Sequence, residues 1–149
     1  MTTTPSAFQR PSPVEKFLNQ GMGFLVNLGL APSHMQVLEV RGRKSGKLCR
    51  TPVDLLELEG KRYLVAPRGR TQWVLNAEVA GIVTLKRGST RQSFHLRALN
   101  EVEKLPILKA YLDRFRKEVQ RFFPIPAGSP AEAFRDVGAN YPAFELLEQ

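Results

Sequence analysis

The spacing of apolar positions divides the chain into a helical start, a strand-rich middle and a helical end. From Val14 to Leu30 the apolar residues recur at roughly helical spacing, which predicts an amphipathic helix. From Gln36 onward the period changes to that of strands, in short runs bounded by turn residues. A helical stripe that begins with Val102 and is surrounded by basic residues returns from Glu101 to Phe123, and Pro124 and Pro126 end it.

The middle of the chain predicts short antiparallel strands joined by tight turns. Five or six such strands imply a meander or a small barrel. A helix of about two turns is expected between the third and fourth strands, with Thr71 as its N-cap. The predicted strands are Gln36–Arg41, Leu48–Glu57, Lys61–Ala66, Ile82–Lys86 and Arg91–Leu99.

Length and composition favour a single domain. The chain has 149 residues, which is close to the commonest domain size. Residues 1–13 are rich in Pro, Ser and Thr and lack apolar periodicity, so we expect a flexible N-terminal segment followed by one domain over residues 14–149. In the tail, a short helical stretch is predicted near residues 130–137, and residues 141–146 are predicted to form an extended aromatic anchor.

Charge and cysteine content narrow the classes of partner. Twenty-two Lys and Arg against fourteen Asp and Glu give a formal net charge of +8, which favours anionic partners, although small cytosolic proteins are also basic for solubility alone. Cys49 is the single cysteine, so an intramolecular disulfide and metal sites built on paired thiolates are excluded, and no metal is predicted.

The chain shows no secretion signal or apolar run long enough to span a membrane, so we expect a soluble, cytoplasmic protein. The helix over residues 14–30 is expected to pack on the domain. Peripheral contact of this helix with a membrane surface stays open as the alternative.

The densest basic cluster predicts an anion-binding hairpin turn. It runs from Arg41 to Lys47, with Arg50 three residues on. Gly42 and Gly46 allow the turn to aim backbone amides inward, and Ser45 adds a hydroxyl donor, which suits a phosphate or carboxylate. The alternative is a solvated hairpin tip whose charge protects an exposed sheet edge.

Successive side chains of a strand point to opposite faces of the sheet, and this distinguishes two of these cations. Lys47 and Arg50 lie on the outgoing strand with opposite side-chain parity, so without a bulge they do not face the same ligand. We therefore prefer Arg50 as the anion-binding residue.

A second cluster follows the third strand and opens the short helix. The amides at the start of this helix, over Gly69 to Trp73, could hold an anion or the polar edge of a ring. Trp73 either stacks on a ligand or anchors the helix to the barrel core, and Asn76 either contacts a ligand or bonds backbone groups.

The order of these motifs resembles the deazaflavin-dependent nitroreductase family. The resemblance covers most of the chain and implies a mainly β fold with flanking helices (α+β), a split β-barrel related to the flavin mononucleotide-binding barrels. It is carried by Arg41-Gly42-Arg43-Lys44-Ser45-Gly46, Arg50-Thr51-Pro52-Val53, Ala66-Pro67-Arg68-Gly69, Trp73 with Asn76, and Tyr141-Pro142-Ala143-Phe144.

The resemblance also implies a cofactor, coenzyme F420, and a reaction, hydride transfer to a quinone, a nitroaromatic or another activated acceptor. Cations of the first cluster would hold the phosphate and acidic tail, two backbone segments would line the ring, and the short helix would close the pocket. The cofactor-binding residues are thus expected to be Arg43, Lys44, Ser45, Arg50, Thr51, Pro52, Val53, Ala66, Pro67, Arg68, Gly69, Gln72, Trp73 and Asn76.

The chain departs from the family pattern at Asp54, where members that reduce nitroaromatics often carry an aromatic residue. No catalytic residue is assigned. The tyrosines at positions 63, 111 and 141 could donate a proton, but each also suits a packing role. His34 has no partner at metal-ligand spacing and His95 is expected at the surface or rim, so neither histidine is assigned a catalytic role.

Other functions stay open on the sequence alone. Flavin mononucleotide (FMN) could occupy the same groove, because it offers the same phosphate. A non-catalytic carrier of a cofactor or an acyl chain is a further alternative, motivated by the unassigned proton donor. Nucleic-acid binding is disfavoured, because the predicted strands do not show exposed aromatic residues at alternating positions. The oligomeric state is undetermined.

Overall fold

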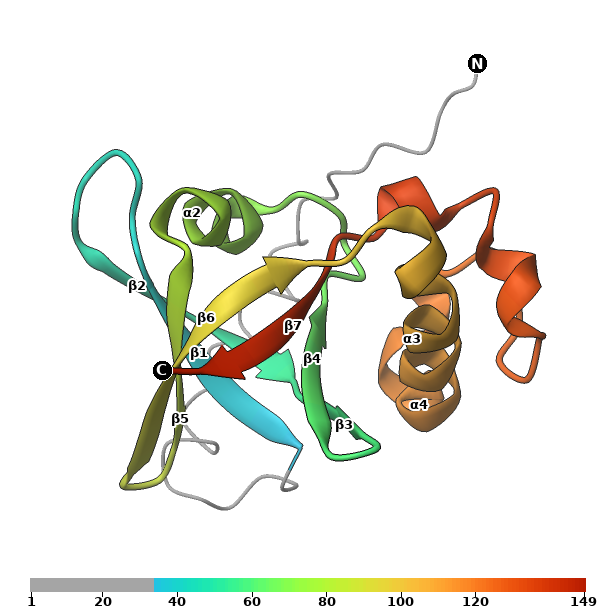
Figure 1. Ribbon diagram of the computed structural model, residues 1–149, viewed down its shortest axis with the longest axis horizontal. Coiled ribbons are helices and arrows are strands. Elements are labelled where there is room, and N and C mark those ends of the chain that lie inside the picture. Colours follow the sequence, from blue (N-terminus) through green and yellow to red (C-terminus); the bar gives the residue numbers. More distant parts are fainter. Residues whose placement is uncertain (1–33) are drawn as a thin grey trace.

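An antiparallel sheet with flanking helices makes up residues 34–149, the part of the chain that the computed structural model describes (Figure 1). The segment predicted as flexible (1–13) and the helix predicted over 14–30 lie outside the described residues. The strands are β1 (Met35–Arg41), β2 (Leu48–Asp54), β3 (Leu56–Leu58), β4 (Lys61–Val65), β5 (Ile82–Arg87), β6 (Thr90–Ala98) and β7 (Ala143–Glu148). The helices are α2 (Gln72–Ala80), α3 (Glu101–Arg114) and α4 (Arg116–Val119), with 3-10 helices η1 (Gln120–Phe122), η2 (Ala131–Phe134) and η3 (Gly138–Asn140).

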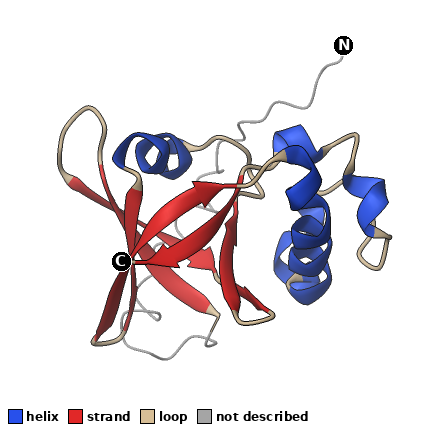
Figure 2. Ribbon diagram, in the orientation of Figure 1, coloured by secondary structure: helices blue, strands red, loops and turns tan. Residues whose placement is uncertain are grey.

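The sheet is curled because a single residue joins its two edges. The strand order is β2-β1-β5-β6-β7-β4-β3, so β2 and β3 are the outermost strands. Leu55 alone separates the end of β2 from the start of β3. Neighbouring strands lie about 4.8 Å apart, so one residue could not connect the opposite edges of a flat sheet of this width. The sheet therefore wraps into a barrel (Figure 2).

The predicted strands are confirmed in position, with one correction. The strand expected over Leu48–Glu57 is interrupted at Leu55, where the chain passes from one edge of the sheet to the other. The Leu55 amide donates to the carbonyl of His34 at 2.7 Å, and its side chain packs in the barrel core.

The tail contributes more than an anchor. Residues 143–148 form β7, which pairs with β6 on one side and β4 on the other. The aromatic segment is thus an inner strand of the sheet, and without it β3 and β4 would have no connection to β6. Local sequence could not show this, because the pairing of β4 with β7 joins segments about eighty residues apart.

Two apolar clusters support the sheet from opposite faces. One fills the barrel and includes Leu38, Val83 and Phe94, all buried. The other packs α3 and the tail against the sheet around Leu108, Tyr111 and further aromatic residues. Helix α2 contacts β1, β2 and β5, while α3 contacts β3, β4 and β7, so the two α-helices lie at different sides of the barrel (Figure 1).

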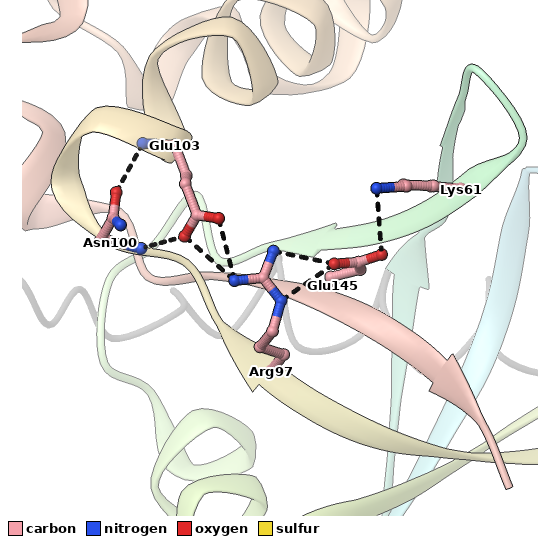
Figure 3. Close-up of polar contacts among 5 residues, drawn as sticks. All are labelled: Lys61, Arg97, Asn100, Glu103 and Glu145. Carbon is pink, nitrogen blue, oxygen red and sulfur yellow. Dashed lines mark hydrogen bonds and ion pairs between the residues drawn. The ribbon is translucent and has the colours of Figure 1, made fainter.

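A polar network ties the inner strands to the start of α3 (Figure 3). Arg97 on β6 donates to Glu145, its direct partner on β7, at 2.9 Å, and to Glu103 on α3 at 2.9 Å. Glu103 completes a capping box with Asn100, in which each side chain bonds the other residue's backbone amide. Lys61 on β4 lies 4.0 Å from Glu145. The network therefore fixes how α3 leaves the sheet.

The long helix predicted over residues 101–123 is divided. α3 ends where Phe115 leaves helical geometry (φ −111°, ψ 26°), and α4 and η1 continue the path. Val102, expected on the apolar stripe, is 67% exposed, so the stripe is wrong at this position. Among residues 34–149, no helix has the length and hydrophobicity needed to cross a membrane.

Truncation of Leu108, which is fully buried between α3 and the sheet, should cost stability. We expect Leu108→Ala to lower the free energy of unfolding by about 2–5 kcal/mol, because it removes apolar contacts and leaves a cavity. Val102→Ala on the same helix should change it by less than about 0.5 kcal/mol. Urea denaturation of both variants measures the difference, and equal losses would contradict the assignment of the buried face.

Candidate functional site

A groove of about 940 Å³ lies between the edge strand β2 and the helices that follow the sheet. Its walls come from β2, from the segment after β4, from the start of α2, and from α4 with η1. We call it the β2–α4 groove. Because three regions distant in sequence form it, its shape depends on the curl of the sheet.

Ten of the fourteen predicted cofactor-binding residues meet on this groove. They are Arg50, Thr51, Pro52, Val53, Ala66, Pro67, Arg68, Gln72, Trp73 and Asn76. The other four, Arg43, Lys44, Ser45 and Gly69, lie in the turns next to it. The structure thus brings the two predicted clusters to a common surface, although they are separated by two strands in the sequence.

The hairpin tip between β1 and β2 is fastened to α2. Asn76 on α2 accepts hydrogen bonds from the Arg43 amide at 3.0 Å and from the Arg43 guanidinium at 2.8 Å. The same guanidinium donates to Gln72 at 3.0 Å. These contacts hold Arg43 beside two residues of the groove wall. Asn76 is buried, so its amide is committed to this tie.

The hydroxyl of Ser45 serves the turn itself. It accepts a hydrogen bond from the Lys47 amide at 3.1 Å, and Gly46 adopts the left-handed conformation (φ 73°) that the turn needs. Lys47 precedes β2 and is absent from the groove lining, whereas Arg50 is part of it. Residues 49–54 all line the groove, so strand parity does not explain this difference.

Arg50 is held by a buried carboxylate. Its Nε donates to Glu39 on β1 at 2.8 Å, and Glu39 is only 3% exposed. Arg91 on β6 approaches the same carboxylate oxygen at 3.4 Å. A buried carboxylate needs such partners, because an unpaired one would carry a large desolvation cost. Arg50 is therefore oriented by the fold before any ligand arrives.

The start of α2 offers a polar edge to the groove. Gly69 has a positive φ (84°) that lets the chain turn from β4 into the helix, and Thr71 stands at the N-cap, as predicted. The Thr71 hydroxyl oxygen is buried and has no hydrogen-bond partner among the described residues. A free hydroxyl at a helix N-terminus suits a ligand that carries an acceptor.

Trp73 is shared between groove and core. It lines the groove, yet its ring also packs near Phe144, with the ring centroids 6.1 Å apart. Both interpretations of this residue from the sequence are therefore compatible with its position.

The wall formed by α4 and η1 was missed in the sequence. The guanidinium groups of Arg68 and Arg121 each lie over the ring of Phe122, 4.6 Å from its centroid. Lys117 and Glu118 line the same wall. The basic residues around the predicted helix were the available signal, but only long-range packing places this end of the helix opposite β2.

Asp54 lines the groove, and its carboxyl is a weaker acid than an ordinary aspartate. Its side chain is 12% exposed, and its Oδ1 lies 3.6 Å from Nε2 of His34. Burial, followed by the nearby charge of Glu118, raises the pKa of the Asp54 carboxyl from 3.8 to about 6. Burial and then the charge of Asp54 raise the pKa of Tyr111 well above its usual value. The groove thus contains one carboxyl that can exchange a proton near neutral pH.

The composition of the groove suits a planar ring with an anionic tail. Pro52, Val53 and Phe122 give it apolar surface, while Arg50 and Lys117 are among its cations. Within residues 34–149, no group of His, Cys, Asp or Glu is placed to hold a metal ion. Binding of an anionic organic molecule is the chemistry that these residues offer.

Comparison with known proteins identifies a family. Residues 19–121 match the family described as F420H2-dependent quinone reductase. This range contains every residue that lines the groove except Phe122. No curated protein matches the chain.

Solved structures confirm the split β-barrel. A structure described as a domain-swapped dimer is 20% identical over 89% of this chain and 92% of its own, with a TM-score of 0.55. An F420-H2 dependent reductase, FDR-A, is 19% identical over 76% of this chain and 94% of its own, with a TM-score of 0.53. A nimc/nima family protein from Clostridium acetobutylicum is 12% identical over 91% of this chain and 88% of its own, with a TM-score of 0.54. At these identities the similarity is one of fold.

The raised pKa of Asp54 predicts a pH-dependent stability. The folded state binds this proton more tightly than the unfolded chain does, so the free energy of unfolding should fall as pH rises from about 4 to about 6 and then level off. Asp54→Asn removes this dependence, so its stability relative to wild type should rise by up to about 3 kcal/mol across that window. Urea denaturation of both proteins between these pH values tests this, and parallel curves would contradict it.

Proposed function

Because the chain belongs to the F420H2-dependent quinone reductase family, and is therefore a reductase that uses the reduced deazaflavin F420H2, we propose that it passes a hydride to a quinone bound in the β2–α4 groove. The proposal rests on one observation: the residues that match the family include all the residues that line the groove except Phe122. This relationship favours an enzyme over a non-catalytic carrier and F420 over flavin mononucleotide.

The residues present fit the cofactor. Its phosphate and acidic tail require cations, which Arg43 and Lys44 on the hairpin tip and Arg50 on β2 supply. Its ring requires an apolar slot with polar partners at the edge. Pro52 provides apolar surface, and the buried hydroxyl of Thr71 lacks a partner among the described residues. We therefore place the tail near the hairpin tip and the ring near the start of α2.

The protein's part in the reaction is to bind, orient and exclude water. When bound, reduced F420 supplies the hydride. Arg50, fixed by Glu39, would hold the tail at a set position along β2, so that the ring lies toward the Asp54 end of that strand. The α4–η1 wall, where the ring of Phe122 contacts the guanidinium groups of Arg68 and Arg121, would cover the opposite side and limit access of water.

A quinone is the acceptor that we favour among activated compounds. It is flat and apolar, which suits the apolar surface that Pro52, Val53 and Phe122 give the groove, and its reduction needs one hydride and one proton. The position that is aromatic in many nitroaromatic-reducing relatives is Asp54 here, so an ionisable group replaces a stacking surface.

Purified protein should oxidise F420H2 when a quinone is added. Under anaerobic conditions we expect faster recovery of oxidised F420 absorbance with a menaquinone analogue than with a nitroaromatic or an enone at equal concentration. A titration with flavin mononucleotide serves as the cofactor control. Turnover with the nitroaromatic alone would show that the acceptor is wrong.

Loss of a cation at the hairpin tip should weaken cofactor binding. We expect Arg43→Ala to raise the Kd for F420 about tenfold or more, because a charge-assisted hydrogen bond contributes about 1.5–3 kcal/mol. Arg50→Ala should act in the same direction. Arg135→Ala is the matched control, since Arg135 is exposed and pairs with Glu132 on η2. Fluorescence titration of F420 measures all three, and unchanged affinity in both Arg43→Ala and Arg50→Ala would remove the site assignment.

A further inference from the structure

His34 and Asp54 are held together by the backbone. Met35 at the start of β1 pairs with Asp54 at the end of β2, and the Leu55 amide donates to the His34 carbonyl at 2.7 Å. The residue before β1 and the last residue of β2 are thus neighbours, and Nε2 of His34 lies 3.6 Å from Oδ1 of Asp54. The His34 ring packs against Phe115, with centroids 4.7 Å apart, which limits its rotation.

The pair lies between two cavities. A second cavity of about 790 Å³, which we call the hairpin cavity, is bounded by the β5–β6 turn and by β3 and β4. These two hairpins lie at the same end of the barrel (Figure 1). His34 lines the hairpin cavity and Asp54 lines the β2–α4 groove, so together they span the wall between the two.

The hairpin cavity is polar enough to hold water. Besides His34, its lining includes Gln36, Glu57, Arg62 and Arg87. A cavity of this size with several polar partners can admit solvent. Protons can therefore reach His34 from a side that a ligand in the β2–α4 groove does not block.

Both facing atoms lack other partners. Nε2 of His34 and Oδ1 of Asp54 are buried and have no hydrogen-bond partner among the described residues. Their separation of 3.6 Å is too long for a good hydrogen bond, yet a small side-chain movement would close it. Buried polar groups without partners are rare in folded proteins and often mark a functional site.

The surroundings of Asp54 favour its protonated form more than the surroundings of an ordinary surface carboxyl do. Glu118 on α4 faces it with a negative charge, and Tyr111 on α3 is neutral over the accessible pH range. Lys117 and Arg121 are the cations of the same wall, and Arg50 lies on the same strand but is paired with Glu39. Burial and then the charge of Glu118 raise the pKa of Asp54 to about 6.

We propose that His34 and Asp54 form a proton relay that carries a proton from the hairpin cavity to the quinone oxygen in the β2–α4 groove. This inference rests on the proposed function, because it names the source of the proton that quinone reduction consumes. Asp54 would be the catalytic residue that touches the acceptor, and His34 the positioning residue that reloads it.

The step is balanced in atoms and electrons. A quinone becomes a hydroquinone by gaining one hydride, which brings both electrons, and one proton. The O–H bond of Asp54 breaks as an O–H bond forms on the quinone oxygen, and Asp54 is left as a carboxylate. Neutral His34 then takes a proton from hydronium in the hairpin cavity and, as the imidazolium, passes a proton from Nε2 to the Asp54 carboxylate. Both groups return to their starting forms, and the net proton comes from solvent.

The test compares Asp54→Asn, Asp54→Glu and His34→Gln with two control variants of exposed residues, Asp136→Asn and His95→Gln. Three quantities are measured: the Kd for F420 by fluorescence, quinone turnover as a function of pH, and the titration of the Asp54 carboxyl by carbon-13 nuclear magnetic resonance in cofactor-free protein. The last readout does not depend on activity.

For Asp54→Asn we expect an unchanged Kd for F420 and a loss in turnover of about 10²-fold. Wild-type turnover should decline as pH rises through the Asp54 pKa near 6, and this decline should be missing in Asp54→Asn. Asp54→Glu should restore part of the rate. His34→Gln should lower turnover less and should shift both the pH profile and the Asp54 resonance titration, whereas the two control variants should match wild type.

The test distinguishes a failure of the relay from a failure of the proposed function. If wild-type protein reduces quinones and Asp54→Asn keeps the same rate and pH profile, the relay is wrong while the proposed function stands. If wild-type protein reduces no quinone, the proposed acceptor is wrong and the relay falls with it. An Asp54 resonance that does not respond to His34→Gln would also overturn the relay.

Discussion

The connection of β2 to β3 through Leu55 is the constraint on which the rest of the structure depends. It forces the outermost strands together, so the sheet curls and its interior fills with side chains. The same closure places the Asp54 end of β2 near the segment that leaves β4, and these become two walls of the groove. A flat sheet with the same strands would have kept the two basic clusters apart.

Two arginines at the groove are oriented by hydrogen bonds to other residues of the protein. The cations of the hairpin tip and of β2 are not loose charges, since Arg43 is tied to Asn76 and Arg50 to the buried Glu39. Such ties add little to stability once the desolvation of the buried carboxylate is counted, but they orient the guanidinium groups in advance. A ligand that binds a preoriented cation loses less conformational freedom than one that must order a flexible side chain.

The sequence was informative where structure is local. Alternation of apolar residues located the strands, glycine and charge located the hairpin tip, and Thr71 marked the start of α2. Ten of the predicted cofactor-binding residues meet on one groove, and the family is confirmed. The wall formed by α4 and η1 could not be predicted, because its place opposite β2 depends on how α3 packs. The contact of His34 with Asp54 could not be predicted either, because it arises from the register of β1 with β2.

The position of β7 has a consequence for the order of events during synthesis. β4 and β6 each pair with β7, which lies between them, and not with each other. The barrel therefore cannot be completed until residues 143–148 have been made. During translation the edges of β4 and β6 stay unpaired while roughly fifty residues after β6 emerge from the ribosome, and unpaired edges are prone to intermolecular association. A nascent chain stalled before residue 143 should therefore depend on chaperones far more than the finished protein does, even though its groove-forming motifs are already made.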